Sequence, residues 1–79
     1  MMPVVLRIDG KRFFFYSNES QEPPHIHVQQ AEKEAKFWLE PVLMAFNHGF
    51  NGPELRRIER LVFEHKHTLL EAWNGYFTD

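Results

Sequence analysis

The dipeptide Asp9-Gly10 constrains the fold of this chain most strongly, because it separates two short apolar runs. Val4-Val5-Leu6-Arg7-Ile8 precedes it, and Lys11-Arg12-Phe13-Phe14-Phe15-Tyr16 follows it. An Asp-Gly pair between two such runs is typical of a tight β-hairpin turn. We therefore expect antiparallel strands near residues 4–9 and 11–17.

Two further strands are predicted after a polar loop over residues 17–22. The pair Pro23-Pro24 excludes a helix there and favours an extended chain entering His25–Gln30. A polar turn then leads to Ala35-Lys36-Phe37-Trp38-Leu39, so we expect strands near 25–30 and 34–40. Residues 41–50 are ambiguous, because Pro41 suits the first turn of a short helix and Gly49 suits its end.

The remainder of the chain has the pattern of an amphipathic helix. Asn51 followed by Glu54 resembles a capping box at its start. The apolar residues recur at spacings that keep one face apolar: Leu55, Ile58, Val62, Leu69, Trp73 and Phe77. We expect one long helix near 53–74 whose Trp73 packs against the sheet.

These elements predict a single α+β domain over residues 1–79, with a four-stranded, mostly antiparallel sheet and one long C-terminal helix packed on one face. A chain of 79 residues buries a modest core, which the 15% aromatic content can fill with few side chains. The lack of cysteine excludes disulfides and thiolate metal sites.

Charge and hydropathy limit the partners of the chain. The net charge of −2 gives no overall basic field of the kind that marks many nucleic-acid-binding proteins. No apolar run approaches the ~20 residues of a membrane span, and the first residues lack the pattern of a signal peptide. We expect a cytoplasmic protein with no membrane partner.

Strand alternation divides the side chains of the sheet between two faces. The face under the helix is expected to carry Leu6, Ile8, Phe13, Phe15, Ile26, Val28, Phe37 and Leu39. The opposite face, called the outer face below, then carries Arg7, Asp9, Arg12, Phe14, Tyr16, His25, His27, Gln29, Lys36, Trp38 and Glu40.

The outer face mixes aromatic and basic side chains, as do small sheets that bind single-stranded nucleic acid. This pattern predicts a substrate-binding set of Arg7, Arg12, Tyr16, Lys36 and Trp38. In the alternative interpretation, the aromatic residues Phe14, Tyr16 and Trp38 form a second small core under residues 41–50 or a contact between two copies of the chain.

The pair His25 and His27 admits three interpretations. As metal ligands, the imidazoles would need further groups from His48, Glu40 or Asp9, and no local spacing completes that set. As catalysts, one imidazole would take a 2′-hydroxyl proton while a cation stabilises the phosphate, as in a metal-independent ribonuclease. As structural residues, both would hydrogen-bond to neighbouring strands or to the preceding loop.

The order of segments resembles a bacterial family known as Domain of Unknown Function 4160. The matching segments are Val5-Leu6-Arg7-Ile8-Asp9-Gly10, Arg12-Phe13-Phe14-Phe15-Tyr16-Ser17-Asn18-Glu19, Pro23-Pro24-His25-Ile26-His27-Val28, Glu34-Ala35-Lys36-Phe37-Trp38-Leu39-Glu40-Pro41, Asn47-His48-Gly49-Phe50, Glu54-Leu55-Arg56-Arg57-Ile58 and Leu70-Glu71-Ala72-Trp73-Asn74. The resemblance implies a bacterial cytoplasmic setting and no established catalytic residues. It also implies a small protein partner encoded nearby, because members are often described as encoded beside a second small domain and suspected of forming toxin–antitoxin pairs.

We therefore expect a small toxin-like or regulatory module that meets RNA or a partner protein through the outer face. Its most specific form is a metal-independent ribonuclease with His25 and His27 as catalytic residues and with no cofactor or bound metal. The alternative is a noncatalytic interaction domain whose aromatic sheet face docks a neighbouring protein or a second copy in a homodimer.

Overall fold

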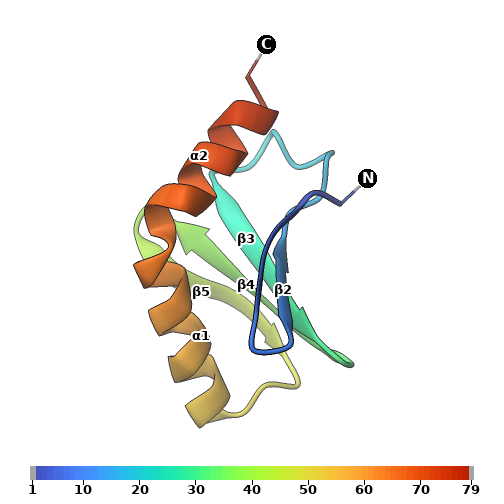
Figure 1. Ribbon diagram of the computed structural model, residues 1–79, viewed down its shortest axis with the longest axis vertical. Coiled ribbons are helices and arrows are strands. Elements are labelled where there is room, and N and C mark those ends of the chain that lie inside the picture. Colours follow the sequence, from blue (N-terminus) through green and yellow to red (C-terminus); the bar gives the residue numbers. More distant parts are fainter. Residues whose placement is uncertain (1, 79) are drawn as a thin grey trace.

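The computed structural model describes residues 2–78, and within them it contains one antiparallel sheet of five strands in the order β1-β2-β3-β4-β5. The strands are β1 (Val4–Ile8), β2 (Lys11–Phe14), β3 (His25–Gln30), β4 (Lys33–Leu39) and β5 (Val42–His48). They are followed by α1 (Gly52–Glu64) and α2 (Lys66–Tyr76), which run across one face of the sheet (Figure 1). The α+β class and the antiparallel pairing are confirmed, with one more strand and one more helix than predicted.

The additional strand is β5, formed by residues for which the sequence also allowed a short helix. Pro41 lies in the two-residue turn between the paired residues Leu39 and Val42, so it ends β4 instead of starting a helix. Gly49 ends β5 with φ +99°, where a Cβ atom would approach Lys33 Cγ to 2.9 Å. Pro41 suits a hairpin turn as well as a helix start, and Gly49 suits the end of a strand as well as the end of a helix. Pairing with β4 selects the strand over the helix.

The predicted single helix is divided at His65. The start of α1 has the predicted capping box, since the Glu54 backbone N–H donates to Asn51 Oδ1 and the Asn51 N–H donates to Glu54 Oε1, both at 2.9 Å. His65, with φ −104° and ψ 14°, ends α1 and precedes α2. Both helices contact β4, but α1 also lies on β5, whereas Trp73 of α2 contacts His25 at the start of β3.

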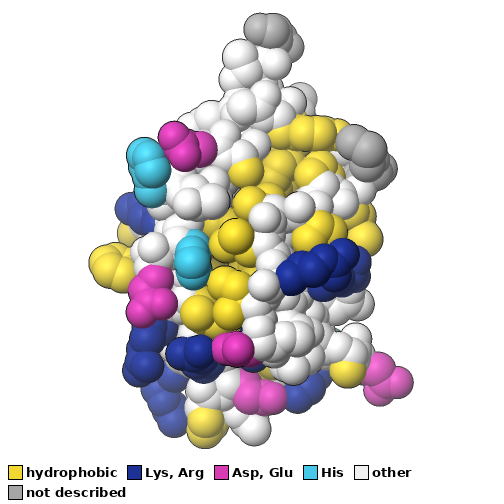
Figure 2. Space-filling view, in the orientation of Figure 1, with side chains coloured by type: hydrophobic (Ala, Val, Ile, Leu, Met, Phe, Trp, Pro, Cys, Tyr) yellow, Lys and Arg dark blue, Asp and Glu magenta, His cyan; other side chains and the backbone are white. Residues whose placement is uncertain are grey.

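The core lies between the sheet and the helices and confirms the predicted inner face. Its fully buried strand residues include Phe13, Ile26, Val28, Phe37 and Leu39, and Phe15, directly after β2, is buried with them. The helices contribute Ile58, Leu61, Val62, Leu69 and Trp73. Leu6 and Ile8 of β1 are only partly buried, and apolar side chains are visible between the helices and the β1–β2 hairpin (Figure 2).

Neither helix of the part described by the structure is long and apolar enough to cross a membrane.

Candidate functional site

The two predicted histidines lie with Glu19 in a buried group, called the His–Glu cluster below (Glu19, His25, His27). His25 is 0% exposed and His27 is 7% exposed, so the expectation that they stand on an open face is wrong. The loop over residues 15–24 supplies Glu19 and covers this part of the outer face. The Leu39 backbone N–H donates to the carbonyl of Pro24 at 3.1 Å and ties the loop to β4.

Glu19 contacts both imidazoles through its carboxylate. His25 Nε2 lies 2.9 Å from Oε1, and His27 Nε2 lies 3.0 Å from Oε2 and 3.2 Å from Oε1. The backbone N–H of Tyr16 also donates to Oε1, at 2.9 Å. Burial by itself would raise the pKa of Glu19, but this backbone N–H and the two imidazoles outweigh burial and lower the pKa. Glu19 is therefore an anion at neutral pH.

The second nitrogen of each imidazole faces another oxygen. Nδ1 of His25 lies 2.9 Å from the carbonyl oxygen of Pro23 and 3.9 Å from Glu22 Oε1. Nδ1 of His27 lies 3.2 Å from Glu34 Oε2. The Pro23 carbonyl accepts a hydrogen bond from His25 and orients that ring, whereas the His27–Glu34 contact is not aligned as a hydrogen bond.

Aromatic rings enclose the cluster. His27 stacks on Phe14 with centroids 5.4 Å apart and meets the edge of Tyr16 at 4.8 Å. His25 contacts Trp38 at 5.6 Å and Trp73 at 4.7 Å. Burial, with the nearby carboxylates of Glu34 and Glu19, raises the pKa of the Tyr16 hydroxyl. Of the three aromatic residues in the alternative interpretation, Phe14 is buried, but beside the loop over residues 15–24 instead of under residues 41–50, while Tyr16 and Trp38 stay partly exposed.

The predicted substrate-binding residues divide into two groups. Tyr16, Lys36 and Trp38 lie around the His–Glu cluster, where Lys36 Nζ donates to Glu22 Oε1 at 2.5 Å and lies 4.6 Å from the Trp38 ring centroid. Arg12 and Arg7 form the other group: they are paired across β1 and β2, and Arg12 lies opposite Gln29, two residues along β3 from His27.

Within that second group, Arg12 donates to Gln29 Oε1 and lies 5.2 Å from the Phe14 ring centroid. The predicted set is therefore not one open basic surface.

The further metal ligands considered from the sequence do not join the cluster. Asp9 pairs with Arg57 at 2.8 Å, and this partner lowers the pKa of Asp9. Glu40 and His48 are exposed near and on β5. The residue that completes the group is Glu19, which sequence reasoning missed because a loop has no side-chain period from which its direction follows.

A second surface that the sequence analysis did not identify runs along β5. Leu43 is 56% exposed, Met44 45% and Phe46 50%, and no residue of Val42–His48 is Lys, Arg, Asp or Glu. β5 is also the last strand of the sheet order, so one of its edges has no paired strand among the described residues. This surface is called the β5 edge below (Leu43, Met44, Phe46).

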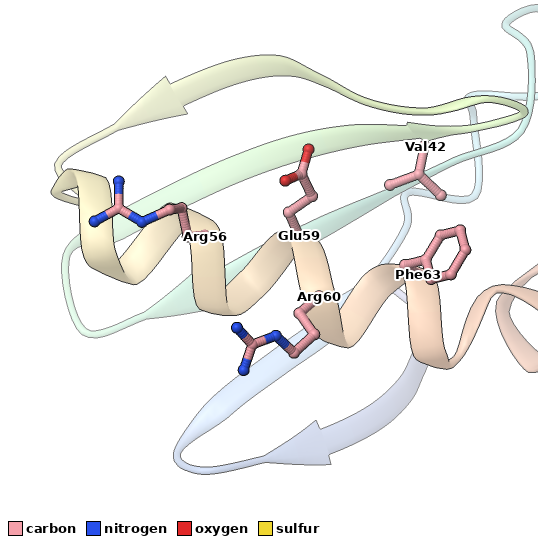
Figure 3. Close-up of a pocket in the computed structure, with 5 residues that line it drawn as sticks. All are labelled: Val42, Arg56, Glu59, Arg60 and Phe63. Carbon is pink, nitrogen blue, oxygen red and sulfur yellow. The ribbon is translucent and has the colours of Figure 1, made fainter.

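A shallow groove of about 390 Å³ lies between the start of β5 and α1. It is lined by Val42, Arg56, Glu59, Arg60 and Phe63. Figure 3 shows Val42 and Phe63 at one end of this groove and Arg56 toward the other. The groove therefore adds two cationic side chains and one exposed aromatic ring beside the β5 edge.

Comparisons with known proteins identify the family of the chain but no individual relative. No curated protein and no solved structure matches the chain. The model of one family, Domain of unknown function (DUF4160), matches residues 10–74, which include β2 to β5, α1, most of α2 and the whole His–Glu cluster. The chain therefore belongs to the family described as Domain of unknown function (DUF4160).

Proposed function

We propose that this domain is a noncatalytic protein-interaction module that binds an extended, mainly apolar segment of a partner protein along the β5 edge. The observation that carries the proposal is the uncharged, half-exposed edge strand. Native proteins usually protect such strands with charged residues, proline or a covering segment, because the free backbone groups readily pair with another strand. An edge strand that exposes Leu43, Met44 and Phe46 is suited to accept one.

Both faces of β5 offer apolar contacts to an added strand. Leu43 pairs with Trp38 and Phe46 pairs with Lys36, which places both on the outer face. Met44 pairs with Phe37 and so lies on the face that carries the helices. Because successive side chains of an added strand alternate between the faces, those beside Leu43, Met44 and Phe46 would meet apolar side chains on both faces.

The cationic groove beside β5 defines the partner further. Arg56 and Arg60 line it with a single acidic residue, Glu59. A partner strand that ends in an acidic residue would be paired there. The proposed partner is the small protein that the family resemblance implies to be encoded nearby, acting with this domain in the cytoplasm as one half of a toxin–antitoxin pair.

A ribonuclease mechanism has weaker support from the geometry. General base catalysis requires an imidazole within hydrogen-bonding reach of the substrate hydroxyl. His25 and His27 are instead buried, and Nε2 of each lies against Glu19. A phosphodiester would reach them only after the loop over residues 15–24 moved away.

The test measures binding of the purified neighbouring-gene product by isothermal titration calorimetry. Phe46→Lys places a charge on the β5 edge and is expected to weaken binding by at least about tenfold, or about 1.4 kcal/mol. Val4→Lys is the matched control, because Val4 is 37% exposed on β1, the opposite edge of the sheet. It should leave the affinity unchanged, and neither substitution should alter the far-UV circular dichroism spectrum.

Several outcomes contradict the proposal. One is the absence of any complex with the neighbouring protein, and another is equal weakening by Val4→Lys and Phe46→Lys. A stable homodimer of the isolated domain that Phe46→Lys dissociates would show that a second copy, and not a separate partner, occupies the β5 edge.

A further inference from the structure

The His–Glu cluster contains a buried nitrogen that no hydrogen bond satisfies. Nδ1 of His25 faces the carbonyl oxygen of Pro23 at 2.9 Å, and a carbonyl only accepts, so Nδ1 carries a proton. In the neutral ring Nε2 then carries no proton and presents a lone pair. This atom is 2.9 Å from Glu19 Oε1, yet the contact is not aligned as a hydrogen bond and Nε2 has no other partner in the part described by the structure.

Two electron-rich atoms at this distance repel each other unless a cation lies beside both. A buried polar atom without a partner is costly, and natural proteins retain few such atoms without a reason. The cluster is therefore a place where a cation would be bound.

His27 supplies a second nitrogen on the other side of the same carboxylate. In the metal-free chain its Nε2 donates to the Glu19 carboxylate, at 3.0 Å and 3.2 Å from the two oxygens, so a metal ion would take the place of this proton, which moves to Nδ1. Its Nδ1 faces Glu34 Oε2 at 3.2 Å. A carboxylate or a backbone carbonyl on the outer nitrogen is the usual partner of a metal-binding histidine. His25 has such a hydrogen bond to the Pro23 carbonyl, and Glu34 lies where it would accept the Nδ1 proton of a metal-bound His27, a nitrogen that has no hydrogen bond in the metal-free chain.

The charges around the cluster are also unbalanced. Three carboxylates face the two imidazoles, from Glu19, Glu22 and Glu34. The one ammonium group that pairs with these carboxylates within residues 2–78 is Lys36, which contacts Glu22 at 2.5 Å. Three carboxylates against one ammonium group leave two negative charges in excess, and a divalent cation balances them.

We propose that Glu19, His25 and His27 bind one divalent metal ion of the zinc type, through Nε2 of both imidazoles and the carboxylate. One such atom from each residue lies within 4.8 Å of the others. The N–O contacts of 2.9–3.2 Å approach the separation of about 3.3 Å between neighbouring ligands that tetrahedral Zn²⁺ bonds of about 2.0–2.1 Å require. A small shift of Glu19 in its loop would open the cluster to this size.

The proposed ion holds the loop over residues 15–24 on the sheet. Glu19 comes from that loop, whereas His25 and His27 come from β3, so the ion links two segments whose packing encloses Phe14 and Tyr16. The Glu19 side chain is 13% exposed and that of His27 is 9% exposed, so solvent reaches the cluster and supplies a water molecule as fourth ligand. This site is independent of the β5 edge and of the proposed function.

The test titrates metal-stripped full-length protein with Zn²⁺ in competition with a chromophoric chelator. One Zn²⁺ per chain is expected to bind, and Co²⁺ is expected to give the intense visible absorption of a four-coordinate ion. Glu19→Gln keeps the size of the side chain and an acceptor for Tyr16 but removes the anionic ligand, so the Zn²⁺ affinity should fall by more than about tenfold. Glu34→Gln, which removes the negative charge beside Nδ1 of His27, should lower the affinity by about 10–100-fold.

Glu71→Gln is the matched control. Glu71 pairs with His67 at 3.4 Å on α2, a histidine–carboxylate pair that is exposed instead of buried. This substitution should leave Zn²⁺ binding unchanged. Circular dichroism of each metal-free variant establishes that it folds, so that lost binding is not a result of unfolding.

Nuclear magnetic resonance of the wild-type imidazole nitrogens gives a readout that needs no variant. Zn²⁺ should shift the Nε2 resonances of His25 and His27 and leave those of His48, His65 and His67 in place. Failure of the wild type to bind one Zn²⁺, unchanged affinity of Glu19→Gln, or shifts confined to the exposed histidines would each overturn the proposal.

Discussion

Replacing Trp73 tests whether the packing of α2 on the sheet stabilises the fold. Trp73 is 5% exposed and lies where α2 reaches the start of β3. Its ring centroid is 5.2 Å from that of Phe15, 4.7 Å from that of His25 and 4.4 Å from that of Phe77. The side chain therefore joins the main core to the His–Glu cluster, and its loss should affect both.

The expected cost is large compared with the stability of so small a domain. Trp→Ala at a buried position costs about 3–5 kcal/mol. At about 0.05–0.15 kcal/mol per residue, a chain of 79 residues has a free energy of unfolding of about 4–12 kcal/mol. With about 4–8 °C lost per kcal/mol for a domain of this size, Trp73→Ala should lower the thermal midpoint by about 12–40 °C.

The measurement is urea or thermal unfolding followed by far-UV circular dichroism, which does not depend on tryptophan fluorescence. Trp73→Phe should lose only part of the stability, because a ring remains beside Phe15 and Phe77. Phe63→Ala is the control: Phe63 is 69% exposed on α1, and its removal should change the free energy of unfolding by no more than about 0.5 kcal/mol. A Trp73→Ala midpoint within about 5 °C of the wild type would refute the packing described for α2.

Three further predictions concern the capping box and the buried histidines. Asn51→Ala removes the acceptor for the Glu54 N–H and should cost about 1 kcal/mol in urea unfolding, whereas Asn51→Asp should cost much less. The Lys33 side chain, and then the Asn51 N–H, lower the pKa of Glu54 below 4.5. The resulting stability is present above about pH 4.5 and lost as the pH falls through the lowered pKa, and Glu54→Gln should flatten this part of a stability–pH curve. His25→Ala with His27→Ala should lower the thermal midpoint of metal-free protein, because both rings are buried; an unchanged midpoint would contradict the enclosed cluster.

Most of the fold could be predicted because the decisive signals are local. The Asp9-Gly10 turn and the period of two in β3 and β4 place Ile26, Val28 and Phe37 in the core without knowledge of the rest of the chain. The capping box at Asn51 likewise depends on residues three positions apart. Such patterns predict structure reliably because the residues involved are close in sequence and therefore remain neighbours whatever the rest of the chain does.

The two errors in the fold arise where local signals agree with more than one structure. The segment from Pro41 to Gly49 could end a hairpin or form a short helix, and the long-range pairing of Val42–His48 with β4 selects the strand. The division at His65 could not be predicted, because no glycine or proline lies beside it in the sequence. It accompanies a change in the part of the sheet that each helix covers, which a helical period in the sequence does not record.

The candidate site was predicted in part. Strand alternation correctly places His25 and His27 on one face, but alternation carries no information about what covers that face. The loop that brings Glu19 onto the two imidazoles has no periodic pattern, so neither the burial nor the third ligand followed from the sequence. The exposure of Phe46 could not be predicted either, because it depends on β5 being the last strand of the sheet.

The central claim, that the β5 edge receives a strand from a partner protein, is tested most directly by amide hydrogen exchange. The outward-facing amides of Val42–His48 have no strand to pair with in the described chain and should exchange rapidly in the free domain. Saturation with the neighbouring-gene product should slow exchange in β5 and leave β1, the other edge strand, unchanged. Protection that appears on β1 or over the loop of residues 15–24, with β5 exchanging as before, would contradict the account.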